Sequence, residues 1–472
     1  MNKSIKPSSN VPVGDNEQGN GQQTQDSPAR RSHAAVCYRM EPSKRMLSHN
    51  GCHFSHLSGD GNHMPPCLLC NQEHSLVELE KVSRVALMIT PEGSGEVVDQ
   101  AWEAVSTIRA ILKQQPVPMT VTSQTVFLRR AEDADVCRKL FAAYFGDHVP
   151  ATNFIVQPPC GGQALAIEAW ALGGEGVDVQ FPQPNVVTVA YDGLRWTQIS
   201  GICPPPSAET AYQQAETAFD ELAARLAHAG ASFNDVVRTW LYQGGITEPE
   251  DGIERYRELN RARTDFFDKQ ESLGRMSIQR GRAAFYPAST GIGMAGRGLA
   301  VSCLALQTQR TDVQLQPLEN PQQVPAFDYA KSFSAKSPKF SRAMAVIIGD
   351  YVTTWISGTA SIVNSESVYL GDIEKQTEQT INNIERLISP YNFERHGMVG
   401  AGAHLPDLAK VRVYVKRPED YEKCRAVCER RLGPLPTIYA QADVCRSNLL
   451  VEIEGVAFSK VSEREKSSER GA

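Results

Sequence analysis

The stretch Pro436–Phe458, PTIYAQADVCRSNLLVEIEGVAF, predicts a loop, an irregular strand, a turn and a final strand that starts at Leu449. Its Val, Ile and Leu residues favour a pleated, half-buried surface. Glu452 and Glu454 lie two residues apart in the final strand, so their side chains point to the same face. A carboxyl group in a buried strand costs free energy unless it is hydrated, paired or protonated. These two acids are therefore candidates for function.

The order of elements that ends in this stretch occurs three times along the chain. A strand, a helix, a Pro loop and a closing strand run from SQTVFLRR to QALAIEAWAL, from VVRTWLYQ to GRGLAVSCLAL, and from KVRVYVKR to NLLVEIEGVAF. A strand and a helix precede each set, with an opening hairpin that we expect to be abbreviated in the first copy. We predict three α+β units over residues 80–177, 184–310 and 325–460, each with two helices against one face of a sheet. Residues 312–338, rich in Gln, Pro and Ser, are the predicted linker before the third unit.

The two ends of the chain differ from these units in composition. Residues 1–75 are polar and rich in Gly and Ser, and we predict a disordered leader there and a disordered tail over residues 461–472. Within the leader, Cys67 and Cys70 have the spacing of half a zinc site, which nearby His residues would complete. A zinc-binding leader is thus the alternative. We expect no cofactor and no metal in the three units.

The composition excludes several classes of partner. The net charge of the 472 residues is −6, which offers no basic surface for nucleic acid. No apolar run approaches the ~18 residues that a membrane helix needs. The 11 cysteines are scattered, which is typical of free thiols in a reducing cytoplasm. We expect a cytoplasmic protein that binds a small molecule and neither nucleic acid nor a membrane.

The repeated pattern resembles the RidA (YjgF, reactive intermediate deaminase) superfamily. The resemblance lies in the I-S-G strand, the helix after it, the V-x-V-x-V strand, the Pro loop and the V-E-I-E strand, and the third unit matches best. It implies chorismate-mutase-like α+β units that form trimers, with sites in the clefts between units. Three such units in one chain imply an internal pseudo-trimer, and we expect the chain to be a monomer.

Alignment of the three closing strands singles out one acid. Ala171, Ala305 and Ala457 correspond, and five residues earlier stand Ala166, Ala300 and Glu452. Only the third unit has a carboxyl group at this position, which the resemblance identifies as the active-site Glu. Glu454 corresponds to Glu168 of the first unit, so we interpret it as a structural acid that is paired with a basic group or a backbone donor. The alternative for Glu452 is the same structural role.

The chain departs from the deaminases at the Pro loops. The deaminases carry an Arg shortly after the loop Pro, and it holds the substrate carboxylate. Asn153, Ser289 and Ile438 occupy the corresponding positions. The loss of this charge-assisted contact argues against hydrolysis of imines or enamines.

A second branch of the superfamily fits better. WTQISG, YRELNRARTDFF, FYPASTGIG, NPQQVPAFDYAKSF with KSPKFSRA, and ADVCRSNLLVEIEG together resemble the chorismatases. The resemblance implies a hydrolase that cleaves the enolpyruvyl ether of chorismate to pyruvate plus a hydroxybenzoate or a dihydroxycyclohexadienoate. The alternatives are a RidA-like imine or enamine deaminase and a small-molecule-binding protein without catalysis.

The chorismatase hypothesis assigns roles to the candidate residues. Glu452 is the proposed general acid, because burial and the charge of Glu454 both raise the pKa of a carboxyl group. Chorismate carries two carboxylates, which call for cations, and Arg suits bidentate binding better than Lys. The candidate cations are Arg446 as the first choice, Arg412, Arg342 and Arg261. The other candidates for substrate binding are Tyr439, Gln441, Ser357, Gly358 and Thr359. Cys445 is interpreted as a packing residue.

Overall fold

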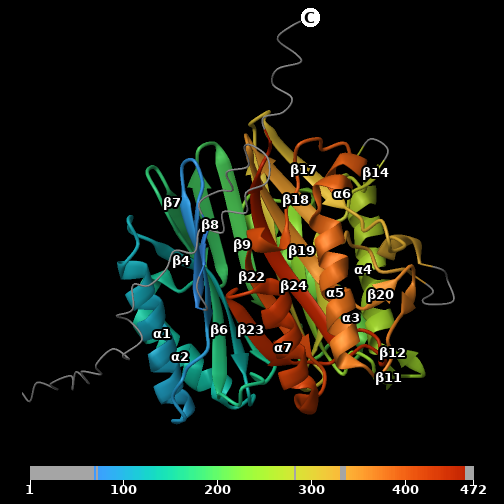
Figure 1. Cartoon of the computed structure of the whole chain (residues 1–472), viewed down its shortest axis with the longest axis horizontal. Helices are drawn as coiled ribbons and strands as arrows, with labels where there is room; N and C mark the ends of the chain where they lie inside the picture. Colours follow the sequence, from blue (N-terminus) through green and yellow to red (C-terminus); the bar gives the residue numbers. More distant parts are fainter. Residues whose placement is uncertain (1–67, 71–72, 281–282, 330–335, 463–472) are drawn as a thin grey trace, which may run out of the picture. The chain divides into compact units, whose positions relative to one another are not determined.

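The computed structural model describes residues 68–70, 73–280, 283–329 and 336–462, in which three six-stranded sheets are covered by helices (Figure 1). The first sheet has the order β1-β2-β3-β6-β4-β5. Its elements are β1 (Leu68–Cys70), β2 (His74–Glu78), β3 (Ser83–Ile89), α1 (Val97–Lys113), β4 (Thr120–Leu128), α2 (Asp133–Phe145), β5 (Ala151–Val156) and β6 (Leu165–Gly173).

The second sheet has the order β7-β8-β9-β16-β10-β15. Its main elements are β7 (Asp178–Gln183), β8 (Val186–Tyr191), β9 (Leu194–Ile202), α3 (Ala211–His228), β10 (Val236–Gly244), α4 (Arg255–Ser272), β15 (Ala288–Met294) and β16 (Leu299–Thr308). Two short hairpins lie outside it: β11 (Pro249–Glu250) with β12 (Ile253–Glu254), and β13 (Gln279–Arg280) with β14 (Ala283–Ala284).

The third sheet has the order β17-β18-β19-β24-β22-β23. Its elements are β17 (Val313–Leu318), β18 (Ala343–Ile348), β19 (Tyr351–Ala360), α5 (Ile373–Ile388), α6 (Pro390–Arg395), β22 (Leu408–Val415), α7 (Tyr421–Leu432), β23 (Thr437–Gln441) and β24 (Val451–Lys460). A hairpin of β20 (Ile362–Val363) and β21 (Glu366–Ser367) follows β19.

The three sheets share one topology. In each sheet the closing strand (β6, β16 or β24) lies in the middle and pairs antiparallel with both neighbours. The strand before the second helix of each sheet (β4, β10 or β22) pairs in parallel with the strand after the Pro loop (β5, β15 or β23). A mixed α+β fold and the threefold recurrence of its elements therefore agree with the sequence analysis.

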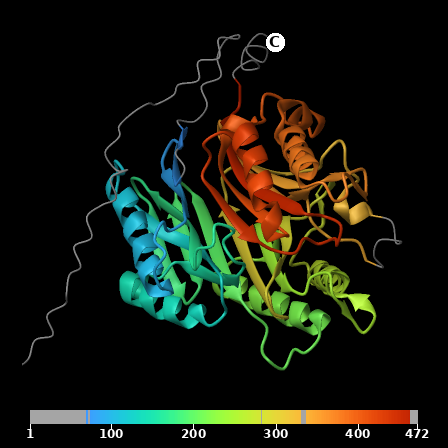
Figure 2. The same ribbon diagram turned by 60° about the horizontal axis from the view of Figure 1, so that its bottom comes forward.

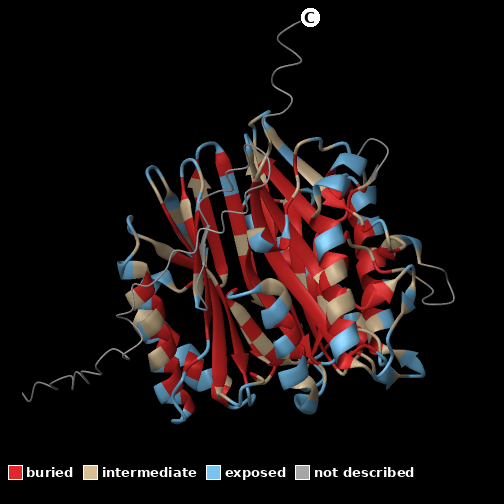
Figure 3. Ribbon diagram, in the orientation of Figure 1, coloured by how far each residue is buried: buried red, intermediate tan, exposed pale blue. Residues whose placement is uncertain are grey.

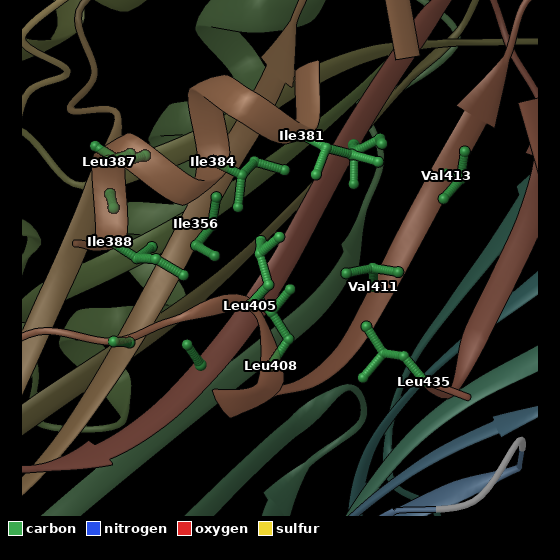
Figure 4. Packing of buried hydrophobic residues seen from close by; sticks show 14 of the residues in the cluster. Ile356, Ile381, Ile384, Leu387, Ile388, Leu405, Leu408, Val411, Val413 and Leu435 are labelled. Atoms are coloured by element: carbon green, nitrogen blue, oxygen red, sulfur yellow. The ribbon is translucent and has the colours of Figure 1, made fainter. Parts of the chain in front are cut away.

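Two helices pack against one face of each sheet, as Figures 1 and 2 show for the helices drawn in the same colours as their sheet. In the third sheet, α5 begins at Asp372, whose side chain accepts a hydrogen bond from the Lys375 N–H at 3.0 Å. Its apolar stripe, Ile381, Ile384, Leu387 and Ile388, lies beside Ile356 of β19 (Figure 4), and α5 also packs against β24. Complete burial of such a side chain contributes about 1.5–3 kcal/mol.

The opposite faces of the sheets meet one another. One buried cluster there combines Val77 and Leu172 of the first sheet with residues of the second and third, including Trp196 and Trp355. The strands are therefore buried on both faces (Figure 3), which explains their nearly continuous apolar sequences.

Each sheet begins earlier than the sequence predicted. Strands β1 and β2 lie partly within the expected leader, and β17 lies within the expected linker. The opening hairpin of the first sheet, expected to be abbreviated, pairs completely between β2 and β3. The boundaries differ because β1, β7 and β17 are all short edge strands: β1 has only three residues, and β7 and β17 contain Gln and Pro, which edge strands tolerate and which weaken the apolar signal.

The remaining expectations for the two termini lie outside the described residues. These include the leader up to residue 67, with Cys67 of the possible zinc site, and the tail from residue 463. Among the described residues, no group of His, Cys, Asp and Glu is arranged to hold a metal ion. No helix in the same residues has the length and apolar character to cross a membrane.

Candidate active site

The pairing of the closing strands confirms the alignment that singled out Glu452. In the equivalent ladders, β4, β10 and β22 each have one extra residue opposite the closing strand, between the partner of Ala171, Ala305 or Ala457 and the partner of the residue before it. Beyond this bulge, Ala166 faces Phe127, Ala300 faces Tyr242, and Glu452 faces Tyr414. Glu452 is therefore a carboxyl group at a position where the other two sheets have a methyl group.

The Glu452 carboxyl group fits in its position because residue 358, beside it, is a glycine. A Cβ atom on Gly358 would lie 1.9 Å from Glu452 Oε1, so no other residue fits at position 358 without moving the acid. Gly358 lies on β19, where its N–H donates to Thr290 Oγ1 at 2.9 Å. None of the described residues donates a hydrogen bond to the Glu452 carboxyl group, whose side chain lines a cavity.

Glu454 has the structural role that the sequence predicted. Its carboxylate forms ion pairs with Arg238 Nη2 at 2.5 Å and Arg412 Nη1 at 2.9 Å, and it accepts a hydrogen bond from Thr290. Arg412 also pairs with Glu168, which binds Lys410 Nζ at 2.9 Å. Burial by itself raises the pKa of Glu454, but Arg412 and Arg238 outweigh this effect and hold the pKa below its ordinary value.

Glu452 has the opposite electrostatic environment. Burial raises its pKa to about 8, and the negative charge of Glu454 adds to the rise. Arg238 and Arg342 act in the other direction and are outweighed. Two carboxyl groups on one face of one strand thus differ in protonation at neutral pH, the arrangement that a general acid requires.

The cavity beside Glu452 has a volume of about 310 Å³, which suits a small-molecule ligand. Its walls come from the second unit, from the third sheet and from the segment between β17 and β18. The residues that line it include Tyr256, Asn260, Arg263, Ser289, Tyr329, Phe340, Arg342, Gly358, Cys445, Arg446 and Glu452. The expected linker therefore contributes a wall of the cavity, through Tyr329 and Pro338.

Two buried guanidinium groups in this cavity have no carboxylate partner among the described residues. Arg263 and Arg342 are 3% and 4% exposed, and the Nε atom of each has no hydrogen-bond partner there. Arg263 donates to Asn260 Oδ1 at 2.5 Å, and Arg342 donates to the Tyr329 hydroxyl at 2.6 Å. Both guanidinium groups lie near the Phe340 ring, at 5.7 and 5.5 Å from its centroid. Glu319 acts on Arg342 electrostatically but forms no ion pair with it. A buried cation that lacks an ion pair is costly, so the two guanidinium groups are suited to an anionic ligand.

Arg263 is a site residue that the sequence analysis missed, together with Tyr256 and Asn260. The three residues follow a spacing of four and three on α4, which places them on one face of the helix. Arg263 Nη1 also lies 3.4 Å from Ser289 Oγ, one of the three positions where an Arg was expected from the deaminase pattern. The helix thus supplies a cation beside the position where the Pro loop lacks one. The signal was present in YRELNRAR, but Arg261 was chosen instead.

The predicted residues Arg446, Arg342 and Gly358 come together with Glu452 in the cavity. Arg446, the first choice for a cation, donates to the Ser365 carbonyl at 2.8 Å and lies over the Tyr329 ring at 5.4 Å from its centroid. It lies after β23, just before the turn at residues 447–448, and its contact with Ser365 ties this segment to the β20–β21 hairpin.

Cys445 also lines the cavity. Burial raises the pKa of its thiol to about 12, and Glu452 adds to the rise. The thiol is therefore protonated at neutral pH, in agreement with a packing role.

Several predicted residues lie elsewhere, and we withdraw them from the site. Arg412 does not face a ligand, because its guanidinium group belongs to the buried ion pairs with Glu168 and Glu454. Arg261 lies on the exposed side of α4 and pairs with Glu258. Alternation along a strand predicted which face Arg412 occupies but not what covers that face.

Tyr439 and Gln441 are also outside the cavity. Their strand, β23, is covered by the segment after β5, where the Cys160 N–H donates to the Tyr439 carbonyl at 3.0 Å and the Gln441 N–H donates to the Pro158 carbonyl at 2.8 Å. This contact with the first sheet closes the region that the sequence assigned to substrate.

Ser357 and Thr359 flank Gly358 but point away from the cavity. The Ser357 hydroxyl donates to the Ser341 carbonyl at 2.6 Å and accepts from the Ser289 N–H at 2.8 Å. The Thr359 hydroxyl donates to the Ser357 carbonyl at 2.9 Å. Both hydroxyl groups therefore fix the backbone around Gly358 and do not contact a ligand.

Comparison with known proteins shows similar chains in one family. Residues 179–305, which include α4 and the Pro loop after it, match a family model described as "Chorismatase FkbO/Hyg5-like, N-terminal". The chain is 34% identical over 299 residues to a 3-hydroxybenzoate synthase of Streptomyces hygroscopicus, covering 62% of this chain and 81% of that one. It is 35% identical over 228 residues to a chorismatase of Streptomyces rapamycinicus, covering 48% and 64% of the two chains.

A solved structure supports the same fold. A chorismatase crystal structure superposes with a TM-score of 0.58 and 22% identity, covering 80% of this chain and 100% of that chain. At this level of identity the superposition shows a shared fold.

Proposed function

This chain belongs to the chorismatase family, and on this premise we propose that it hydrolyses the enolpyruvyl ether of chorismate. The products are pyruvate and either a hydroxybenzoate or a dihydroxycyclohexadienoate. The observation that carries the proposal is a cavity in which a buried carboxyl group with a pKa of about 8 meets two buried guanidinium groups without carboxylate partners among the described residues.

The two guanidinium groups match the charge of the substrate. Chorismate has a carboxylate on its ring and another on its enolpyruvyl group. Arg263 and Arg342 supply one cation for each of them, and bidentate contacts would fix the orientation of the substrate as well as its affinity. Arg446 adds a third positive charge at the mouth of the cavity.

Glu452 starts the reaction as a general acid. Its proton passes to the terminal methylene carbon of the enol ether, which becomes a methyl group and leaves an oxocarbenium ion at the ether carbon. Water adds to this carbon and returns a proton to the Glu452 carboxylate. The resulting hemiketal collapses with cleavage of its bond to the ring oxygen, which releases pyruvate and a ring alcohol. A ring hydroxyl can trap the same cation in place of water.

The reaction is tested by incubating the full chain with chorismate. We expect pyruvate, measured with lactate dehydrogenase, to appear in equal amounts with one ring product that is identified by chromatography and mass spectrometry. The control is the Glu452→Gln variant under the same conditions. Pyruvate release no faster than in this variant would contradict the proposal.

The arginines give a second prediction. We expect Arg263→Met and Arg342→Met each to raise KM for chorismate roughly 10- to 150-fold, because each loses a charge-assisted contact of about 1.5–3 kcal/mol. The matched control is Arg261→Met, on the same helix, whose side chain is 47% exposed and pairs with Glu258. Unchanged KM in both cavity variants would remove these residues from substrate binding.

We also propose that the three sheets are copies of one unit around a pseudo-threefold axis, with the active cavity between the second and third copies. The identical strand order of the sheets supports this arrangement. The described residues that line the cavity span two units of one chain, which supports a proposed enzyme that works as a monomer.

A further inference from the structure

A second cavity lies where the three sheets face one another, apart from the chorismate cavity. Its volume is about 70 Å³, and strands of all three sheets line it. The lining includes Arg84 on β3, Trp196 on β9 and Trp355 on β19. Neither Glu452 nor Arg263 reaches this space, so the proposed reaction does not account for it.

Arg84 is the unusual residue in this second cavity. Arg84 is only 7% exposed, and its guanidinium group forms no ion pair with any described carboxylate. Its Nη2 donates to the Tyr191 hydroxyl at 2.7 Å, and its guanidinium carbon lies 5.1 Å from the centroid of the Trp196 ring. Its Nε atom has no hydrogen-bond partner among the described residues. These contacts offset only part of the cost of burying the charge.

A second unpartnered donor belongs to a residue that lines the same space. Trp355, which is 5% exposed, has an indole N–H without a hydrogen-bond partner among the described residues. An indole N–H can only donate, so it requires an acceptor. The side-chain oxygens of Gln124 and Gln198, which also line the cavity, lack a donor among the described residues, while the Gln124 amide nitrogen donates to Thr152 Oγ1 at 3.1 Å.

The surrounding charges favour an anion over a cation. The charged groups that line the cavity are Arg84, Arg412 and Glu168. Glu168 is already held by Lys410 and Arg412, and Glu454 is held by Arg238 and Arg412. The region thus holds two buried carboxylates and four buried cations. The cations are Arg238, Lys410 and Arg412, which are paired, and Arg84, which is not, so positive charge is in excess.

We propose that this central cavity binds a small monovalent anion, held by the Arg84 guanidinium group and the Trp355 indole N–H. The volume admits an ion of the size of chloride or formate, with water that donates to Gln124 Oε1, and excludes larger organic anions. The ion neutralises the Arg84 charge at a point where the three sheets meet, so it stabilises the fold and does not take part in the reaction.

The test compares the melting temperature of the full chain in sodium chloride, sodium formate and sodium gluconate at equal ionic strength. A ligand that binds only the folded state raises the melting temperature, and gluconate is too large to enter. We expect a rise of at least about 2 °C in chloride or formate relative to gluconate, and the better of the two identifies the class of ion. Equal melting temperatures in the three salts would mean that the cavity holds only water.

Two variants locate the effect. Arg84→Met keeps the packing on Trp196 without the charge and should abolish the difference between the salts. Arg310→Met removes a guanidinium group that already has Asp192 and Asp312 as partners, and should retain the difference. If the difference persists in Arg84→Met, the ion binds elsewhere and the proposal fails.

A crystallographic measurement covers the case in which Arg84→Met does not fold. Crystals of the unmodified chain in sodium bromide should show an anomalous-scattering peak within hydrogen-bond distance of Arg84 Nε. A map without this peak would overturn the proposal independently of any variant.

Discussion

The Glu452→Gln variant should lower kcat for chorismate cleavage by about 10²–10⁴-fold, the usual contribution of general acid catalysis. Gln keeps the size and polarity of the side chain but has no acidic proton to give to the methylene carbon. KM should change little, because the carboxylates of the substrate are assigned to the arginines. Steady-state kinetics of the purified variant, beside a melting curve that shows it to be folded, measure both quantities.

The pH dependence of the unmodified enzyme gives the same residue a second signature. Burial raises the pKa of Glu452 to about 8, so the acid form dominates below this pH and is lost above it. The ratio kcat/KM should therefore fall as the pH rises past about 8. The residual kcat/KM of Glu452→Gln should not show this decrease. Turnover at the unmodified rate in Glu452→Gln would assign the proton to another group.

The Glu454→Gln variant should be destabilised by about 3–5 kcal/mol, although it lies only two residues from Glu452. The substitution leaves Arg238 and Arg412 buried with one carboxylate fewer, and loss of one partner of a buried ion pair exposes the cost of the charge that remains. The free energy of unfolding in urea measures the effect. Glu452→Gln, which breaks no ion pair, should be far less destabilised.

The matched control for Glu454→Gln is Glu422→Gln on α7. Its ion pair with Arg425 is exposed at the surface, and such pairs contribute about 0–1 kcal/mol. If Glu454→Gln stays as stable as this control, the buried ion pairs do not hold the three sheets together. If it remains folded and loses more turnover than Glu452→Gln, the two acids have been assigned the wrong roles.

Much of this protein follows from local sequence. Alternation in VEIEG placed Glu452 and Glu454 on one face. Comparison of the three closing strands showed that only the third has an acid at the position aligned with Glu452. The strand order of the three sheets and the positions of their bulges agree with that alignment. These features were predictable because the spacing of side chains along a strand or a helix depends only on neighbouring residues.

Other features depended on contacts between segments far apart in the chain. Arg238 and Glu454 are separated by 216 positions, and no local pattern indicates that they pair. Arg412 was assigned to substrate because its strand face was known but its neighbours, Glu168 and Tyr242, were not. Tyr439 was misplaced for the same reason, since the segment after β5 covers its strand.

The cations of the proposed site show most clearly which features depend on local sequence and which depend on tertiary structure. The sequence determined the repeated α+β units, the unique acid and the need for positively charged groups near it. Only the tertiary structure decided that Arg263 and Arg342 face the cavity without carboxylate partners, whereas Arg412 and Arg261 are already paired. The physical reason is that the cost of a buried charge depends on which other charges the packed sheets bring within a few ångströms of it, and sequence spacing does not contain that distance.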